Sequence, residues 1–155
     1  MSLAPLNKAR SAVGLKYGWR SGLEEAVGAQ LTAAKTAFTF EALAIPYVPL
    51  KLERKYTPDF ILSNGIVVET KGRFETDDRQ KIKAILQQYP DLDLRMVFSR
   101  SAARISKTSK TTYAMWCTSH GIPFADKRIP AEWLKEADSP RSLAVLAQLK
   151  QQAKK

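Results

Sequence analysis

Hydrophobic residues recur at helical spacing in two parts of the chain. From Ser21 to about Lys35, apolar side chains fall three and four residues apart, which gathers them on one face of a helix. A second stretch of this kind runs from Thr76, a residue suited to an N-cap, to about Tyr89. Pro90 follows and disfavours continuation of the helix. The pattern therefore predicts two amphipathic helices.

Strands are predicted where apolar residues alternate or run together. Residues 38–42 and 92–98 alternate between apolar and polar positions. Between them, the apolar runs 60–62 and 66–68 flank the turn sequence Ser63-Asn64-Gly65, so they are expected to form a β-hairpin. The order of helix, strands, helix and strand predicts a mixed β-sheet flanked by helices, which is an α/β (α+β) fold.

The remaining segments have weaker patterns. Residues 45–49 contain two prolines, which lack the backbone donor that a sheet ladder requires, so this segment is expected at a sheet edge or as an extended connector. A further helix is expected to begin at a capping Thr111 or Thr112 and to end at Gly121 in the left-handed conformation. A short strand over 122–126 is expected to follow.

A chain of 155 residues fits one domain, here with an irregular segment at each end. Residues 1–19 lack periodicity and carry basic side chains, as is typical of a flexible basic arm. Residues 20–138 hold the predicted helices and strands and are assigned to the folded domain. Residues 139–155 are assigned as a basic C-terminal tail whose helix is weakly specified and frayed.

Net charge and cysteine content narrow the class of protein. The formal charge is +10, from 25 Lys and Arg against 15 Asp and Glu, which predicts binding to a polyanion, with nucleic acid favoured over a membrane. The single cysteine, Cys117, cannot form an internal disulfide, and no apolar run is long enough to span a membrane. A cytoplasmic protein is expected. No Gly-rich phosphate loop follows a strand, so no nucleotide cofactor is expected.

Basic residues gather in stretches that lack acidic residues. One stretch precedes Glu24, another ends at Asp126 and a third occupies the end of the chain. These stretches favour contact with DNA phosphates, which fix the position of a protein on a duplex. The candidates for phosphate contact are Arg20, Arg73, Arg100, Arg104, Lys107 and Lys110.

Asp59, Glu69 and Lys71 are the residues best suited to catalysis. Hydrolysis of a phosphodiester uses carboxylates that hold a divalent metal such as Mg²⁺, and a lysine can offset the charge that develops on the phosphate. Whether the three side chains meet depends on the hairpin register, because a shift of one residue inverts the face of a strand. The alternative is that Glu69 and Lys71 form a surface ion pair at a strand edge.

Two turn lengths give different registers of the hairpin. A two-residue Asn64-Gly65 turn would pair Phe60 with Glu69 and leave Asp59 on the wrong face. A three-residue loop over 63–65, with Gly65 in the left-handed conformation, would place Asp59 directly opposite Glu69. We expect the three-residue loop for this reason.

Glu24 has two interpretations. Ser21-Gly22-Leu23-Glu24 matches a capping box, in which the Glu24 side chain bonds back to the backbone at Ser21. On spacing alone this structural role is favoured over a catalytic one.

Several motifs together resemble the phage endonuclease I family of Holliday-junction resolvases. The resemblance covers roughly residues 20–136. Its first motifs are Arg20-Ser21-Gly22-Leu23-Glu24, Tyr56-Thr57-Pro58-Asp59-Phe60 and Asn64-Gly65-Ile66-Val67-Val68-Glu69-Thr70-Lys71-Gly72. Its later motifs are Asp77-Asp78-Arg79, His120-Gly121-Ile122, Phe124-Ala125-Asp126-Lys127 and Ile129-Pro130-Ala131-Glu132-Trp133.

The resemblance implies a restriction-endonuclease-like fold of the Pro-Asp…Glu-x-Lys nuclease superfamily and metal-dependent cleavage of branched DNA. By this analogy Asp59, Glu69 and the main-chain carbonyl of Thr70 hold one Mg²⁺, and Glu24 with Asp59 holds a second. Mn²⁺ is expected to substitute. Lys71 would orient the attacking water or offset charge in the transition state.

The resemblance also implies an intertwined homodimer, in which Glu24 reaches the active site of the other subunit and the segment from Pro46 to Pro49 crosses between subunits. If the protein is encoded by a phage, it would act in the host cytoplasm. Two other hypotheses remain: a non-catalytic basic DNA-binding module, for which Asp59 and Glu69 would be dispensable, and a restriction or repair nuclease of the same fold.

Overall fold

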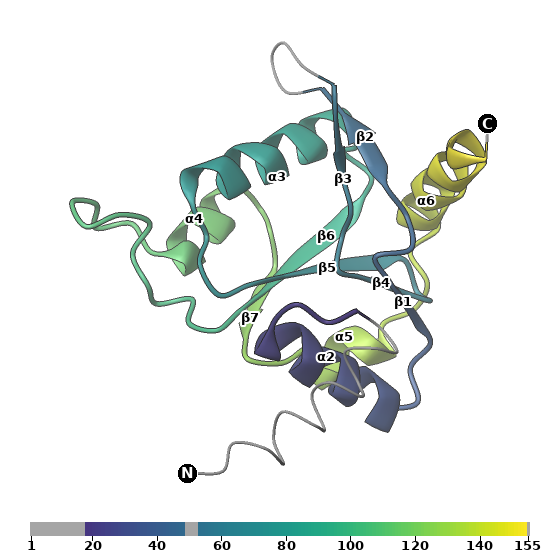
Figure 1. Cartoon of the computed structure of the whole chain (residues 1–155), viewed down its shortest axis with the longest axis horizontal. Coiled ribbons are helices and arrows are strands. Elements are labelled where there is room, and N and C mark those ends of the chain that lie inside the picture. Colours follow the sequence, from purple (N-terminus) through teal and green to yellow (C-terminus); the bar gives the residue numbers. More distant parts are fainter. Residues whose placement is uncertain (1–17, 49–52, 155) are drawn as a thin grey trace.

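A five-stranded mixed sheet forms the centre of this computed structural model, which describes residues 18–48 and 53–154 (Figure 1). In sheet order, its strands are β1 (Phe38–Phe40), β4 (Phe60–Leu62), β5 (Ile66–Lys71), β6 (Asp93–Phe98) and β7 (Phe124–Asp126). The pairs β1–β4 and β4–β5 are antiparallel, whereas β5–β6 and β6–β7 are parallel. The predicted mixed sheet flanked by helices is confirmed.

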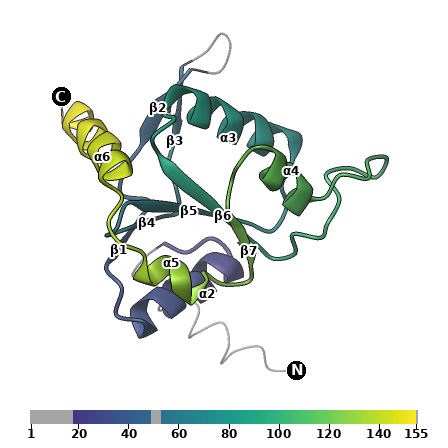
Figure 2. The same cartoon turned by 180° about the vertical axis from the view of Figure 1, so that it is seen from behind.

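Helices cover both faces of this sheet. The helices are α2 (Gly22–Ala33), α3 (Thr76–Gln88), α4 (Tyr113–Ser119), α5 (Ala131–Lys135) and α6 (Pro140–Ala153). Helices α2 and α5 lie on one face, and α3, α4 and α6 pack on the other (Figures 1 and 2). A small antiparallel sheet of β2 (Ile45–Tyr47) and β3 (Arg54–Tyr56) packs on the same face as α3, α4 and α6.

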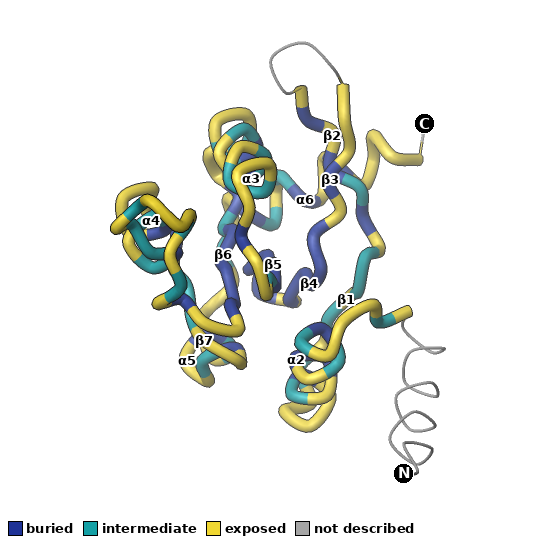
Figure 3. The backbone as a smooth tube through the Cα atoms, turned by 60° about the vertical axis from the view of Figure 1, so that its left-hand side comes forward, coloured by how far each residue is buried: buried dark blue, intermediate teal, exposed yellow. Residues whose placement is uncertain are grey.

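Two hydrophobic cores result, one on each face of the sheet. Along β5, Val67 enters the core beneath α3, while Ile66 and Val68 enter the core beneath α2. All three are at most 1% exposed, so β5 is covered on both faces, as is usual for a central strand with parallel pairing. Figure 3 shows this buried centre and the exposed outer sides of the helices.

The hairpin register agrees with the three-residue loop. Phe60 pairs with Val68 and Ile61 with Val67, so the next pair outward is Asp59 with Glu69. Gly65 has a φ of +93°, and its N–H donates to the carbonyl of Leu62 at 3.0 Å. The positive φ is the conformation that glycine adopts at least cost.

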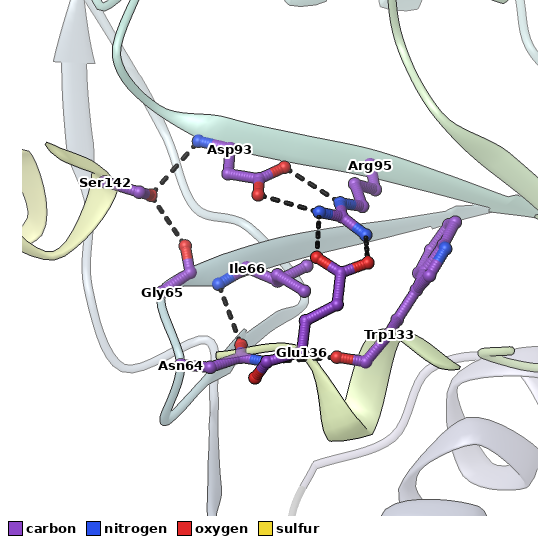
Figure 4. A network of polar contacts seen from close by, with 8 residues as sticks. All are labelled: Asn64, Gly65, Ile66, Asp93, Arg95, Trp133, Glu136 and Ser142. Carbon is purple, nitrogen blue, oxygen red and sulfur yellow. Dashed lines mark hydrogen bonds and ion pairs between the residues drawn. The ribbon is translucent and has the colours of Figure 1, made fainter. Parts of the chain in front are cut away.

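Asn64 anchors this turn to the C-terminal part of the chain (Figure 4). Its side-chain Nδ2 donates to the carbonyls of Trp133 at 3.0 Å and Glu136 at 3.3 Å, and its Oδ1 accepts from the N–H of Ile66 at 3.2 Å. Asn64 is buried, so these bonds satisfy polar groups that water cannot reach.

Arg95 extends the same network across β6 (Figure 4). Its guanidinium makes paired bonds to Asp93, at 2.8 and 2.9 Å, and to Glu136, at 2.8 and 2.7 Å. It also lies 5.1 Å from the ring centre of Trp133. The Ser142 hydroxyl of α6 donates to the carbonyl of Gly65 at 2.6 Å. Strands β5 and β6 are thereby fastened to α5 and α6.

The predicted helix boundaries hold with small differences. Ser21 caps α2 by accepting from the N–H of Glu24. At α3, the cap is Glu75 rather than Thr76, because the carboxylate of Asp78 accepts from the N–H of Glu75 at 3.0 Å. Thr112, of the two candidates, caps α4, and Gly121 follows its end with a φ of +68°.

The structure describes the C-terminal tail, part of the proline segment and little of the predicted N-terminal arm. The tail was expected to carry a frayed helix, but α6 buries Leu146 and Leu149 against the sheet. Pro46 lies exposed on β2, at the edge expected for it, whereas Pro49 lies outside the described residues. Residues 1–17, which make up most of the predicted basic arm, also lie outside them.

Replacing Asn64 with alanine should destabilise the protein. The change leaves a buried carbonyl of Trp133, a partly buried carbonyl of Glu136 and one buried N–H without their present partner, so we expect a loss of about 2–4 kcal/mol in the free energy of unfolding. Ser63→Ala, at the exposed neighbouring turn position, should change it by less than about 0.5 kcal/mol. Urea denaturation of the three proteins measures both values, and equal losses would contradict the anchoring role.

Candidate active site

Asp59 lies just before β4 and is held by Thr70 of β5. Its Oδ2 accepts from the Thr70 N–H at 2.8 Å and from the Thr70 hydroxyl at 2.7 Å. The side chain of Asp59 is almost fully enclosed, with the residue 6% exposed. The hairpin register therefore brings Thr70 to Asp59, and two donors on one oxygen fix the orientation of this carboxylate.

Glu69 lies on the same hairpin and has a different set of partners. The Tyr56 hydroxyl donates to Glu69 Oε2 at 2.5 Å, and Lys71 Nζ lies 3.6 Å from Glu69 Oε1. Both Tyr56 and Glu69 are buried. Glu69 and Lys71 point to the face of the sheet that β3 and α3 cover. Their ion pair involves a buried Glu69 on the central strand β5, so it is not the surface pair at a strand edge that was the alternative.

Lys71 lies between two carboxylates. Its Nζ is 3.3 Å from Asp78 Oδ1, in the first turn of α3, as well as 3.6 Å from Glu69. Burial lowers the pKa of Lys71, but the attraction of Glu69 and Asp78 outweighs it and leaves that pKa above its ordinary value. Lys71 is consequently an ammonium ion at neutral pH.

A group of three carboxylates forms on the other side of Asp59. Oxygen atoms of Glu24, Glu41 and Asp59 lie within 4.8 Å of one another. Glu24 also takes part in capping: its N–H donates to Ser21 Oγ at 3.1 Å, and its Oε2 accepts from the Arg20 N–H at 2.9 Å. The Glu24 carboxylate therefore bonds to the backbone of Arg20 rather than to that of Ser21, which the capping box predicted, and this bond uses only one of its two oxygens.

Glu41 is a member of this group that sequence reasoning missed. It follows β1, whose antiparallel register with β4 pairs Phe40 with Phe60 and so brings Glu41 to Asp59. The Glu41 N–H donates to the Asp59 carbonyl at 3.2 Å, and its carboxylate pairs with the Arg20 guanidinium. The β1–β4 pairing, had it been predicted, would have identified this residue.

Tyr56 and Asp78 were likewise not assigned to the site. Both occur in motifs that carried the family resemblance, Tyr56 three residues before Asp59 and Asp78 at the start of a predicted helix. Their partners are Glu69 and Lys71, which they reach only through the packing of β3 and α3 on the sheet. Local spacing along the chain carries no sign of these contacts.

The electrostatics of the group favour a bound cation. Burial raises the pKa of Asp59 although Thr70 donates two hydrogen bonds to it, and Glu24 raises it further. Burial, followed by the charge of Asp59, raises the pKa of Glu69 to about 8 despite Lys71. Buried carboxylates with too little positive charge around them are stabilised in their ionised form by a metal ion.

The donor set fits a hard divalent cation. Mg²⁺ and Mn²⁺ are bound by carboxylate and carbonyl oxygens. Asp59 links the two acidic groups of the site, because it adjoins Glu24 and Glu41 and acts electrostatically on Glu69. Thr70 contacts Asp59 through its N–H and hydroxyl, and a role for its main-chain carbonyl stays a prediction.

The predicted phosphate contacts fall in two places. Arg20 lies on the α2 side, where it pairs with Glu41. The other residues lie near the end of β5 or on the segment between β6 and α4, which Figure 1 shows extending away from the body. Arg73, Arg104 and Lys107 line one open depression, and Arg100 and Lys110 are exposed on the same segment.

The base of this segment is tied to the candidate site. The Ser99 N–H donates to the carbonyl of Lys71 at 3.2 Å. Two residues later, the N–H and hydroxyl of Ser101 donate to the carboxylate of Asp126, at 2.8 and 3.0 Å. Exposed cations thus begin at Arg73 and Arg100, within two residues of Lys71 and of Ser99, which bonds to it.

This mixed sheet, with two carboxylates and a lysine on its central hairpin, is the arrangement expected of the restriction-endonuclease-like class. The sequence profile of phage endonuclease I matches residues 5–154. Endonuclease I of Escherichia phage T7 is 52% identical over 118 residues, which cover 76% of this chain and 79% of that protein. Endodeoxyribonuclease 1 of Enterobacteria phage T3 is 49% identical over 118 residues, covering 76% and 78%.

The chain belongs to the phage endonuclease I family. The resemblance first identified from separate motifs is therefore confirmed over most of the chain. Within the described residues, every helix is too short or too polar to cross a lipid bilayer.

Glu69 should make the stability of the metal-free protein depend on pH. Its pKa is about 8 in the folded protein against an ordinary 4.5, so its contribution is complete below pH 4.5 and is lost as the pH rises through 8. Between about pH 5 and pH 9, wild type should lose roughly 2–5 kcal/mol more than Glu69→Gln.

Denaturant unfolding in EDTA across this pH range measures the difference. Glu132→Gln, at an exposed position of α5, should follow wild type. Mg²⁺ should reduce the loss at high pH because a cation binds the ionised carboxylate. Parallel pH profiles for wild type and Glu69→Gln would contradict the assignment.

Proposed function

We propose that this protein is a structure-selective, metal-dependent DNA endonuclease that resolves four-way junctions and other branched DNA by phosphodiester hydrolysis. The observation that carries the proposal is the set of two buried carboxylates, Asp59 and Glu69, with the partly exposed Lys71, which the hairpin brings together in a chain of the phage endonuclease I family. The host cytoplasm is the proposed place of action.

Asp59 is the proposed shared ligand of two metal positions. Asp59 and Glu69, with the carbonyl of Thr70, would hold one Mg²⁺, and Asp59 with Glu24 would hold the second. Glu41 is close enough to Glu24 and Asp59 to belong to the second position. When bound, such ions lower the pKa of water and neutralise charge on the phosphate. Mn²⁺ would be accepted by the same oxygen ligands.

The role of Lys71 follows from its charge. The neighbouring acids raise the pKa of Lys71 and favour its ammonium form, which suits stabilisation of charge better than removal of a proton from water. Its ammonium group, held by Glu69 and Asp78, instead donates hydrogen bonds and stabilises negative charge on the reacting phosphate. Fixing the ammonium in advance reduces the reorganisation that the reaction requires.

The exposed basic residues would bind the arms of the DNA through phosphates. Such contacts depend on the shape of the backbone rather than on base identity, which suits a branched substrate. Arg73, Arg104 and Lys107 are the strongest candidates because they line one depression next to the end of β5.

We also propose an intertwined homodimer. A four-way junction needs two matched cuts, and a two-fold dimer presents two equivalent sites. In the single chain, Glu24 lies beside Asp59. Exchange of the part of the chain before the Pro46–Pro49 segment would move Glu24 into the other subunit's site and preserve the same contacts.

Two other functions compete with this proposal. A DNA-binding module without catalysis would use the same basic surface but would not need buried carboxylates. A restriction or repair nuclease of the same fold would need them and would cut linear duplexes. Membership of the endonuclease I family favours a nuclease over a binding module.

Substitutions in the hairpin should abolish cleavage and preserve binding. Asp59→Asn should reduce Mg²⁺-dependent cutting of a four-way junction by about 1,000-fold or more, because it removes the shared ligand. Lys71→Ala should reduce it by about 100-fold, because one fixed positive charge is lost. Single-turnover cleavage measures the rates, and gel-shift titration in Ca²⁺ measures binding.

Matched controls separate the rival functions. Asp77→Asn and Lys83→Ala change exposed residues of α3 and should cleave like wild type. Wild type should cut the junction faster than a linear duplex of the same sequence, and EDTA should stop both reactions. Near wild-type cleavage by Asp59→Asn would overturn the proposed chemistry, and equal cutting of both substrates would favour the restriction-type enzyme.

A further inference from the structure

Tyr56 makes a contact inside the site that the proposed chemistry does not use. It is the last residue of β3, pairs with Ile45 of β2 and is 3% exposed. Its hydroxyl donates to Glu69 Oε2 at 2.5 Å, while Glu69 Oε1 faces Lys71. The ring packs in the core beneath α3, so the hydroxyl has little freedom to leave this position.

The same short segment supplies the second carboxylate of the site. Tyr56 is followed by Thr57, by a buried Pro58 and then by Asp59. Proline fixes its own φ, which limits the ways in which Tyr56 and Asp59 can move relative to each other. The segment therefore supplies one acid of the hairpin, Asp59, and contacts the other, Glu69, through the hydroxyl of Tyr56.

We propose that Tyr56 is a positioning residue for metal binding, which holds the Glu69 carboxylate in the orientation that ligation requires. The inference rests on the proposed function. The hydrogen bond from the Tyr56 hydroxyl to Oε2 restricts rotation of the carboxylate and favours the orientation in which Oε1 faces Lys71. Donors that orient a ligand in this way commonly contribute 10–100-fold to metal affinity or activity.

A purely structural role predicts something different. In that case the hydroxyl bonds to Glu69 only because a buried polar group needs a partner, and its removal would change stability alone. Metal affinity separates the two roles, because it depends on the orientation of Glu69 and can be measured without catalysis.

The test is Mn²⁺ binding to the full-length chain, measured by calorimetry without DNA, together with the Mg²⁺ concentration that gives half-maximal junction cleavage. Tyr56→Phe keeps the ring and should weaken Mn²⁺ binding by about tenfold or more and raise the Mg²⁺ requirement in proportion. Tyr47→Phe is the matched control. Tyr47 lies buried on β2 in the same core, and its hydroxyl has no hydrogen bond to the described residues.

A second substitution tests the route through Glu69. In a Glu69→Gln background, Tyr56→Phe should cause no further loss of Mn²⁺ binding, because both changes act on one ligand. Mg²⁺ added to the wild type should also perturb tyrosine ultraviolet absorption, and this signal should persist in Tyr47→Phe. The spectral measurement does not depend on whether Tyr56→Phe folds.

The outcomes distinguish this inference from the proposed function. If Asp59→Asn loses Mn²⁺ binding but Tyr56→Phe binds Mn²⁺ like wild type, the role of Tyr56 is wrong and the proposed function stands. If Asp59→Asn itself binds Mn²⁺ like wild type, the proposed metal site is wrong. Additive losses from Tyr56→Phe and Glu69→Gln, or an unchanged tyrosine spectrum on saturation with Mg²⁺, would also overturn the role of Tyr56.

Discussion

The three-residue turn over residues 63–65 decides which side chains of β4 and β5 share a face of the sheet. A turn shorter by one residue would move Asp59 away from Glu69 and break the bonds from Thr70 to Asp59. Hydrogen bonds to residues far along the chain stabilise this register. The anchoring of Asn64 to the carbonyls of Trp133 and Glu136 makes the C-terminal part of the chain a support for the candidate site.

The enclosed acids impose a second constraint. Removing carboxylates from water is costly unless positive charge replaces the lost hydration. Lys71 supplies one charge, but it is shared between Glu69 and Asp78, and the pKa of Glu69 still rises to about 8. The imbalance that destabilises the metal-free site is thus what favours a divalent cation there, so binding and stability are linked through the same residues.

Local signals in the sequence were sufficient for α2, α3, α4, the strands of the central sheet and the hairpin acids, whereas β3, α5 and the contacts between distant segments were not predicted. The α2 helix and the turn at Gly65 follow from spacing and glycine chemistry over a few residues. Glu41 reaches Asp59 only through the β1–β4 pairing, and Tyr56 reaches Glu69 only because β3 folds over the sheet. The burial of α6 likewise depends on packing against strands that lie far from it in the sequence.

Anomalous X-ray diffraction from crystals grown with Mn²⁺ tests the central claim most directly, because it locates the ion independently of activity. We expect an anomalous peak in bonding contact with the carboxylate of Asp59, shared with Glu69 on one side or with Glu24 and Glu41 on the other. The peak should be absent in Asp59→Asn crystals. A fully occupied Mn²⁺ site elsewhere, with none at Asp59 in a preparation that cleaves junctions, would contradict the account.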